Sequence, residues 1–135
     1  MINQNIYEGA LKILAETTDA SANEDYEIRA PYLIAAFCSE TEELDSDYRR
    51  ANSLGTTSKV NDVYLALSDV FPRASRFASA ACVYLASMLI IDTDPELSDK
   101  LYEKCSDMLA TIASSIPQAA EPSAEIEDII DRYGF

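Results

Sequence analysis

Apolar residues recur at helical spacing along most of the chain, and this pattern predicts a mainly helical protein. The apolar positions of the first segment are Ile2, Ile6, Ala10, Ile13 and Leu14. They share one face of an amphipathic helix that is predicted to end near Glu16. The polar stretch TTDASANED follows and is typical of a loop.

A second helix is predicted in the segment YEIRAPYLIAAFCSETEELDSDYRR. One stripe of this helix holds Leu33, Phe37, Thr41, Leu44 and Tyr48. Pro31 could occupy its first turn or kink a longer helix that begins near Asp25. No loop signal precedes the proline, so the pattern favours the kinked helix. The stretch ANSLGTTSK then predicts a break.

Residues 59–71 carry a weaker signal. Val63, Leu65 and Leu67 alternate as in a strand, but the same stretch also fits a short helix. A single strand would have no partner elsewhere in the sequence. Irregular structure is therefore predicted here.

The run FASAACVYLASMLII, residues 77–91, is 15 residues long and has no charge. A membrane span needs about 20 apolar residues, and Arg76 and Asp92 flank this shorter run. Apolar side chains surround the predicted helix almost completely. This pattern predicts a buried central helix with neighbours on more than one side.

The sequence DTDPEL predicts a tight connection to the next helix. Thr93 or Asp94 is expected to cap the new helix, with Pro95 in its first position. A connection of about three residues makes the two helices antiparallel. The chain is therefore predicted to be an all-α protein, a small helical bundle with a C-terminal αα-hairpin of residues 73–91 and 95–115.

The end of the chain is predicted to be a separate part. Residues 1–116 would form the bundle, and residues 117–135 a Pro-containing linker followed by a short, acidic, amphipathic helix. The apolar face of this helix holds Ile126, Ile129, Ile130 and Tyr133. A helix this short is marginal alone in water. These four residues are therefore candidate partner contacts, and their face could pack on the chain's own bundle or on a neighbouring subunit.

Charge limits the classes of partner. The chain has 135 residues, with 10 basic and 24 acidic side chains and a net charge of −14. Such a surface repels phosphate backbones and anionic lipids. Neither direct nucleic-acid binding nor membrane binding is expected.

The charge is also unevenly distributed. Residues 51–91 carry two acids and three bases, a net of +1, whereas residues 92–135 carry eleven acids and three bases, a net of −8. This asymmetry favours head-to-tail contact between copies. Such a contact is expected to weaken as salt rises.

The residues predict no catalytic, cofactor or metal site. The chain lacks histidine, the commonest general base and metal ligand. Its cysteines, Cys38, Cys82 and Cys105, have no chelating spacing, and their odd number favours reduced thiols packed in the core of a cytosolic protein. Residues 92–103 approach a calcium-loop pattern, but Leu97 stands where the turn needs glycine.

A family resemblance is carried by four stretches in order: the YEIRAPYLIAAFCSE helix, the Gly-containing break, LSDVFP, and ASRFASAACVYLASMLIIDTDPELSDKLYEKCSDMLATI. In this order they resemble small proteins of tailed-bacteriophage and prophage morphogenesis clusters, above all the helical head–tail connector (adaptor) proteins. Those proteins share a YLA-type helix, a DPEL-type turn and a closing helix, matched here by residues 84–86 and 94–97. The resemblance spans most of residues 25–113 and lies in core positions, so it carries over no binding residue.

Two functions are therefore expected. The resemblance implies a non-enzymatic virion structural or assembly protein that forms a ring by contacts with itself, the portal or another phage structural protein. Such a protein would lie in the cytoplasm of a bacterial host before assembly and in the virion afterwards. The alternative is a cytosolic helical adaptor or regulator that binds a basic protein partner.

Overall fold

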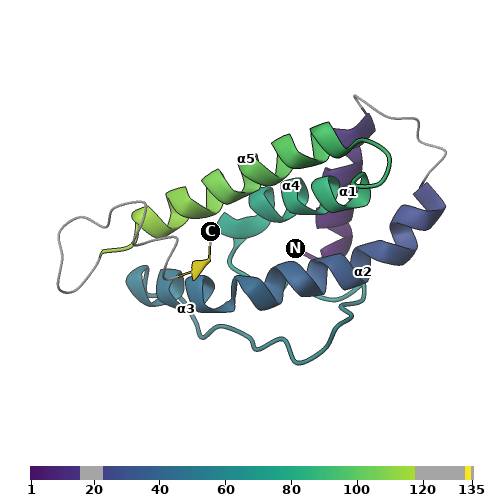
Figure 1. Ribbon diagram of the computed structural model, residues 1–135. Helices are drawn as coiled ribbons and strands as arrows, with labels where there is room; N and C mark the ends of the chain where they lie inside the picture. Colours follow the sequence, from purple (N-terminus) through teal and green to yellow (C-terminus); the bar gives the residue numbers. More distant parts are fainter. Residues whose placement is uncertain (16–22, 118–132, 135) are drawn as a thin grey trace.

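The uncharged run of the sequence forms α4 (Ala78–Leu89), and this helix lies at the centre of the protein (Figure 1). It packs against α1 (Asn3–Ala15), α2 (Asn23–Glu40) and α5 (Pro95–Ser114). Its buried residues point in all directions around the axis and are Ala80, Ala81, Val83, Tyr84, Leu85, Ala86, Ser87 and Leu89. The prediction of a central buried helix is confirmed.

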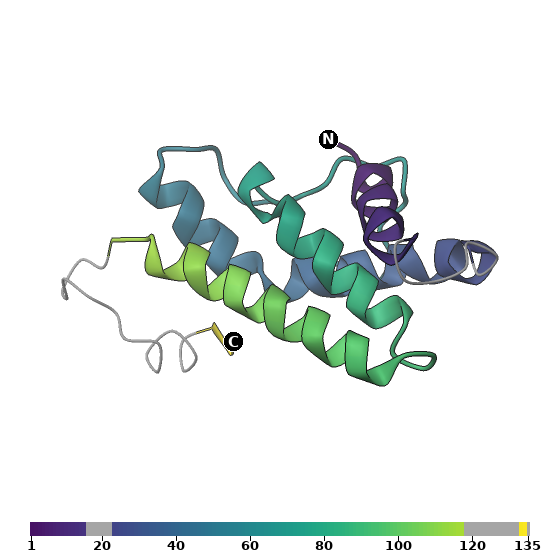
Figure 2. The ribbon, with the colours of Figure 1, turned by 90° about the horizontal axis from the view of Figure 1, so that it is seen from above.

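The computed structural model describes residues 1–15, 23–117 and 133–134. Within them, α3 (Glu42–Ala51) continues the line of α2, and a short 3-10 turn, η2 (Ser75–Phe77), precedes α4 (Figures 1 and 2). These described residues form helices and no strand, so the predicted all-α bundle is confirmed. No helix among them is both long and apolar enough to cross a membrane.

The predicted hairpin is formed by α4 and α5. Asp94 caps α5 by accepting a hydrogen bond from the Leu97 amide at 3.1 Å, and Pro95 takes the first helical position. Between the helices, the Ser87 hydroxyl donates to the Ser98 carbonyl at 2.8 Å, and the Ser98 hydroxyl donates to the Ser87 carbonyl at 2.9 Å. These small buried side chains allow the two backbones to lie close together.

The first arm of the hairpin is shorter than predicted. Residues 73–74 are not helical, because the Ala74 amide donates to the buried Asp45 carboxylate and the Arg73 side chain reaches α2. At the other end, Ile91 was expected on the buried face but is exposed. It lies beyond the end of the helix, in the turn, and so no longer follows the helical period.

The second predicted helix is divided in two. It does begin before Pro31, as expected, and runs from Asn23 as α2. It ends at Glu40 because the Thr41 hydroxyl donates to the Phe37 carbonyl at 2.8 Å, next to the Thr41 amide that donates to the same oxygen at 3.1 Å. The amide hydrogen bond is kept, and a threonine hydroxyl that bonds back to the same carbonyl favours a bend in the helix. α3 then starts one residue later.

α1 crosses α4 at one end of the bundle (Figure 2). Its buried positions are Asn3, Ile6, Tyr7, Ala10 and Leu14, which include most of the predicted apolar face. Gly9 makes the close crossing possible, since a Cβ at this position would lie only 2.6 Å from Cys82 Sγ. A glycine in a helix is unfavourable by about 1 kcal/mol relative to alanine, and here it provides room for a neighbouring helix.

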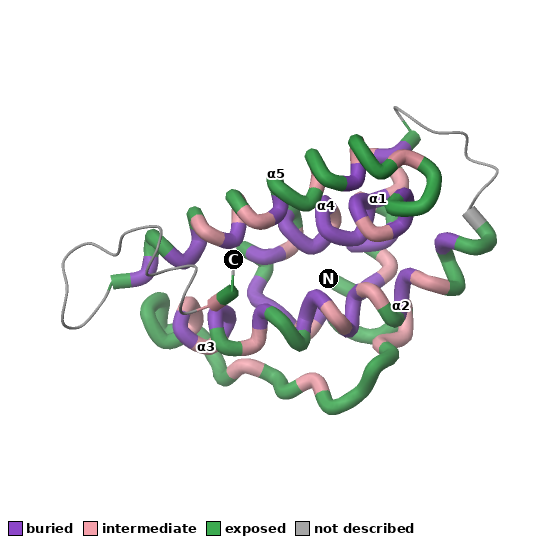
Figure 3. Tube along the Cα trace, in the orientation of Figure 1, coloured by how far each residue is buried: buried purple, intermediate pink, exposed green. Residues whose placement is uncertain are grey.

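Residues 52–74, which we call the anchored segment, connect α3 to η2 without a helix or strand. This segment runs along the outside of α2 and is mostly exposed or half-buried (Figures 1 and 3). The predicted irregular structure of residues 59–71 is therefore confirmed. One isolated antiparallel bridge joins Ile2 to Val70, so the pairing partner of this stretch is the N-terminus of the chain.

Candidate functional site

The predicted contact residues at the C-terminus are only partly visible. Ile126, Ile129 and Ile130 lie outside the described residues. Tyr133 is described, and its hydroxyl donates to Asp47 Oδ2 on α3 at 2.6 Å while its ring packs at the edge of the core. The Tyr133 side chain thus contacts the chain's own bundle, the first of the two packings that the sequence allowed.

A buried carboxylate fixes both ends of the anchored segment. Asp45 on α3 is completely buried and accepts three hydrogen bonds, each 2.8 Å long. The donors are Arg49 Nε one turn along the same helix, the Thr57 hydroxyl near the start of the segment, and the Ala74 amide at its end. A carboxylate with this number of donors is well satisfied despite its burial.

A buried guanidinium holds the same segment from within. Arg73 donates twice to the Cys38 carbonyl, at 2.6 and 3.0 Å, and also to the carbonyls of Ser58 at 2.7 Å and Pro72 at 2.9 Å. The Cys38 carbonyl belongs to the last turn of α2, where a positive charge interacts favourably with the helix dipole. The nearest carboxylate oxygen, on Glu42, is 3.8 Å from Arg73.

The burial of Arg73 changes the predicted charge pattern. Sequence alone assigned a mildly basic surface to residues 51–91, but the Arg73 charge lies inside the protein. The exposed charges that are left in this range are Lys59, Arg76, Asp62 and Asp69, two of each sign. The exposed charges of residues 51–91 therefore sum to zero instead of +1, and the head-to-tail contact between copies stays a prediction.

The N-terminus of the chain supports the later part of the anchored segment, residues 67–71. The amides of Asn3 and Gln4 donate to the carbonyls of Asp69 at 2.9 Å and Leu67 at 2.8 Å, and the Phe71 amide donates to the Met1 carbonyl at 3.1 Å. The first amides of a helix have no partner within that helix. The segment supplies these partners for α1, so each element completes the hydrogen bonding of the other.

Large apolar side chains stand exposed where the anchored segment lies along α2. Ile28 and Tyr32 project from α2 with 66% and 53% of their surface exposed, and Val63 and Tyr64 project from the segment with 76% and 46% exposed. The rings of Tyr32 and Tyr64 meet edge to face with centroids 5.2 Å apart. We call these four residues the tyrosine patch. Sequence reasoning missed this patch, because it depends on contact between residues 32 positions apart.

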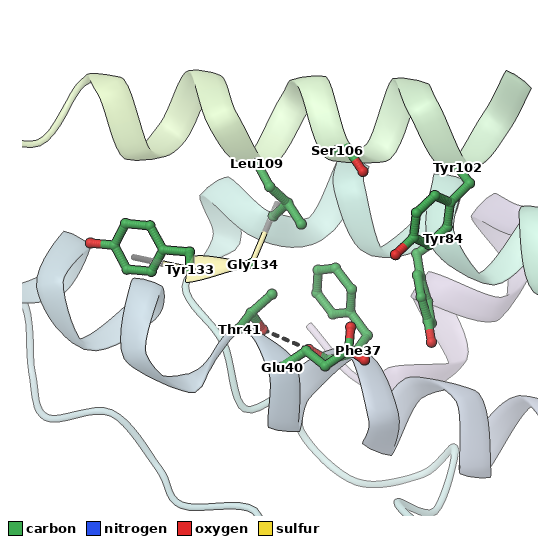
Figure 4. Close-up of a pocket in the computed structure, with 9 residues that line it drawn as sticks. All are labelled: Phe37, Glu40, Thr41, Tyr84, Tyr102, Ser106, Leu109, Tyr133 and Gly134. Atoms are coloured by element: carbon green, nitrogen blue, oxygen red, sulfur yellow. Dashed lines mark hydrogen bonds between the residues drawn. The ribbon is translucent and has the colours of Figure 1, made fainter. Parts of the chain in front are cut away.

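A cavity lies between α2, α4 and α5 (Figure 4). Its volume is about 390 Å³. The lining residues are Phe37, Glu40, Thr41, Tyr84, Tyr102, Ser106, Leu109, Tyr133 and Gly134. Tyr84 and Tyr102 form one end and Tyr133 the other, with Phe37 between them (Figure 4).

Burial keeps Tyr84 and Cys105, near this cavity, protonated. It raises the pKa of Tyr84 to about 12, and the negative charge of Glu40 acts in the same direction. Burial also raises the pKa of Cys105 to about 12, again with a contribution from Glu40. Both groups are therefore neutral at physiological pH, and Cys105 is not an activated thiolate.

The other two cysteines also pack as small apolar residues. Cys38 is buried, and burial raises its pKa to about 12 although the nearby Arg73 charge lowers it. Cys82 is half-buried beneath α1, and its pKa is raised by the same cause. The predicted packing of the cysteines as core residues is confirmed for Cys38 and Cys105. The part of the chain that the structure describes holds no group of three side chains suited to a metal ion.

No protein-family model, curated protein or solved structure matches the chain.

Proposed function

We propose that this protein is a non-enzymatic structural or assembly protein, similar to a head–tail connector, that forms a ring by contacts with copies of itself. The observation that carries the proposal is the tyrosine patch. Its four side chains are large, apolar and exposed, and a backbone hydrogen bond between Leu65 and Pro31 joins the two stretches of chain that carry them. Contiguous exposed apolar surface is a common mark of a protein–protein interface.

The fixed backbone favours a binding role. Hydrogen bonds to Asp45 and Arg73 restrain the anchored segment near its start, and bonds to the N-terminus restrain residues 67–71. A further bond joins the Leu65 amide to the Pro31 carbonyl at 3.1 Å, directly beside the patch. A surface that is ordered before binding loses less conformational entropy when a partner docks.

A second copy fits the charge properties of the patch. None of its four residues is charged, although the chain carries a net charge of −14. Two such chains repel each other over long distances, so contact between copies is favoured at uncharged side chains such as these. Salt screens the repulsion, and self-association should therefore strengthen as salt rises. This reverses the salt effect expected from sequence, because Arg73 is buried.

Sedimentation equilibrium at increasing protein concentration tests the proposal. Tyr64→Ser should weaken self-association roughly tenfold, as expected for an aromatic residue at the centre of an interface. Leu54→Ser is the matched control, because Leu54 is similarly exposed on the same segment but lies outside the patch. A strict monomer at high concentration and high salt, with no affinity for a portal protein, would argue against a ring-forming role.

An adaptor that binds a basic partner is the second candidate. It is favoured by a hollow of about 440 Å³ beside α3, whose charged lining residues are the acids Glu42, Glu43 and Asp47 and the bases Arg50 and Lys59, an excess of one negative charge. A basic partner would bind more weakly as salt rises, whereas contact between copies through the tyrosine patch would strengthen. The sign of the salt effect therefore separates the two candidates. The ring-forming function would place the protein in the cytoplasm of a bacterial host and then in the virion.

A further inference from the structure

The cavity between α2, α4 and α5 is lined by closely spaced aromatic rings. The ring centroids of Phe37 and Tyr84 are 5.6 Å apart, and those of Tyr84 and Tyr102 are 6.5 Å apart. Tyr133 lies at the opposite end, with its ring directed away from the other three toward Asp47 on α3 (Figure 4). Ligand pockets usually measure about 300–1,000 Å³. At about 390 Å³, this cavity suits a single side chain or a small molecule better than a large cofactor.

The polar groups of the cavity favour positive charge. Glu40 contributes a carboxylate, and it makes no hydrogen bond or ion pair with the described residues. The hydroxyl groups of Tyr84, Tyr102 and Ser106 supply further oxygen atoms at the wall. No lysine or arginine lines the cavity. Glu40 is the last residue of α2 and lines the cavity together with Tyr84.

We propose that this cavity binds one organic cation, the ammonium or guanidinium group of a lysine or arginine side chain presented by a protein partner. Aromatic faces attract cations, and the Glu40 carboxylate supplies the opposite charge. The opening is accessible, since Glu40 is exposed and 45% of the Tyr102 surface is exposed. The inference rests on the second candidate function in one respect, namely that the ligand belongs to a basic protein partner and not to another copy of this acidic chain.

A protein is the fitting source because of charge complementarity. The net charge of −14 attracts basic chains from a distance, and the cavity then receives one side chain from the surface that docks. A cation bound between an aromatic face and a carboxylate gains from both interactions, whereas a neutral side chain of the same length gains from neither.

Nuclear magnetic resonance titration of the full chain tests the inference. The probes are capped arginine amide, capped lysine amide and the neutral analogue capped norleucine amide. We expect saturable shifts at the amides of Phe37, Tyr84, Tyr102 and Ser106 with both cations and none with norleucine. Shifts that do not saturate, or that are equal for the neutral probe, would overturn the inference.

Variants locate the bound cation. Glu40→Gln should weaken arginine-amide binding about fivefold, as for a partly exposed ion pair, and Tyr102→Leu about tenfold through loss of the cation–π contact. The control is Glu103→Gln. Glu103 follows Tyr102 on α5 but does not line the cavity, so this variant makes the same charge change as Glu40→Gln at a site outside it. If this control weakens binding as much as Glu40→Gln, the effect is one of overall charge and the cavity is not the site.

Self-association measured on the same samples separates this inference from the proposed function. Saturable probe binding with the expected variant effects supports the cation site even if the wild-type chain stays monomeric, in which case only the assembly role fails. Self-association without probe binding overturns the cation site and leaves the assembly role standing.

Discussion

The α4–α5 hairpin is stabilised by hydrogen bonds between residues that are close in sequence. The anchored segment is stabilised by hydrogen bonds to residues that are far away in sequence. The reciprocal hydrogen bonds of the hairpin join Ser87 and Ser98, 11 positions apart. Those of the segment join Ala74 to Asp45 across 29 positions and Arg73 to Cys38 across 35. The hairpin relies on apolar burial and local capping, and the segment on buried charge. The two regions should therefore respond differently to substitution.

The largest effect is expected at Asp45. Asp45→Ala should destabilise the protein by about 3–5 kcal/mol, because it removes one partner of a largely buried ion pair and takes the acceptor from Arg49 Nε, the Thr57 hydroxyl and the Ala74 amide. Chemical denaturation measures this change, with the exposed Asp62→Ala as control. If Asp45→Ala costs no more than Asp62→Ala, buried charge does not hold the segment.

Cavity-creating substitutions test the hairpin. Leu85→Ala should cost about 2–5 kcal/mol because Leu85 is fully buried in α4. Sequence alone predicts the same range for Met88→Ala, but Met88 is only half-buried, so its truncation should cost clearly less. Denaturant midpoints of the two variants provide the comparison. Losses below half a kcal/mol at both positions would refute the central role of α4.

Stability should fall in alkaline solution. The thiols of Cys38 and Cys105 lose their protons at the ordinary pKa of 9.0 in the unfolded chain but near 12 in the folded one. The stability that comes from burying the neutral thiols is thus complete below pH 9 and is lost as the pH rises from 9 to 12. Each thiol contributes a slope of about 1.4 kcal/mol per pH unit.

Cys105→Ala provides the check on this slope. Unfolding free energies measured between pH 8 and pH 11 should decline less steeply in the variant by the contribution of one group. An unchanged slope would mean that the Cys105 thiol is not responsible, and that the growing negative charge of the chain accounts for the decline instead.

The smallest effect is expected at the hairpin turn. Asp94→Ala removes the cap that accepts from the Leu97 amide and should cost about 1 kcal/mol. Asp94→Asn keeps a capping oxygen and should restore most of the loss. Thermal melting of the two variants distinguishes capping from a simple charge effect, since both remove the same negative charge.

Local signals explain which parts of the fold could be predicted from sequence. The DTDPEL turn and the uncharged run specify the hairpin through capping, proline and apolar burial, all of which act within a few residues. The end of α2 at Glu40 was not predicted, because Thr41 falls on the apolar stripe of a continuous helix as well as it fits a position between two helices. The late start of α4 was missed because Asp45 and Cys38 determine it, and neither is near in sequence.

The candidate sites were harder to predict than the helices, because each is formed by residues that are far apart in sequence. The tyrosine patch requires residues of α2 to meet residues of the anchored segment, and the cavity requires side chains from three helices. Apolar periodicity indicates which face of a helix is buried but not which exposed residues gather. The burial of Arg73 shows the same point for charge, because a formal count cannot tell an exposed arginine from one enclosed by carbonyl groups.

The central claim is that the anchored segment is an ordered surface whose tyrosine patch contacts another copy. Hydrogen–deuterium exchange of the full chain at low and high protein concentration tests it most directly. We predict that the amides of Leu65, Asp69 and Phe71, which are hydrogen-bonded within the chain, exchange slowly at both concentrations. The amides of Val63 and Tyr64 should become protected only at high concentration. Exchange of the whole segment at the rate of an unfolded chain, at every concentration, would contradict the account.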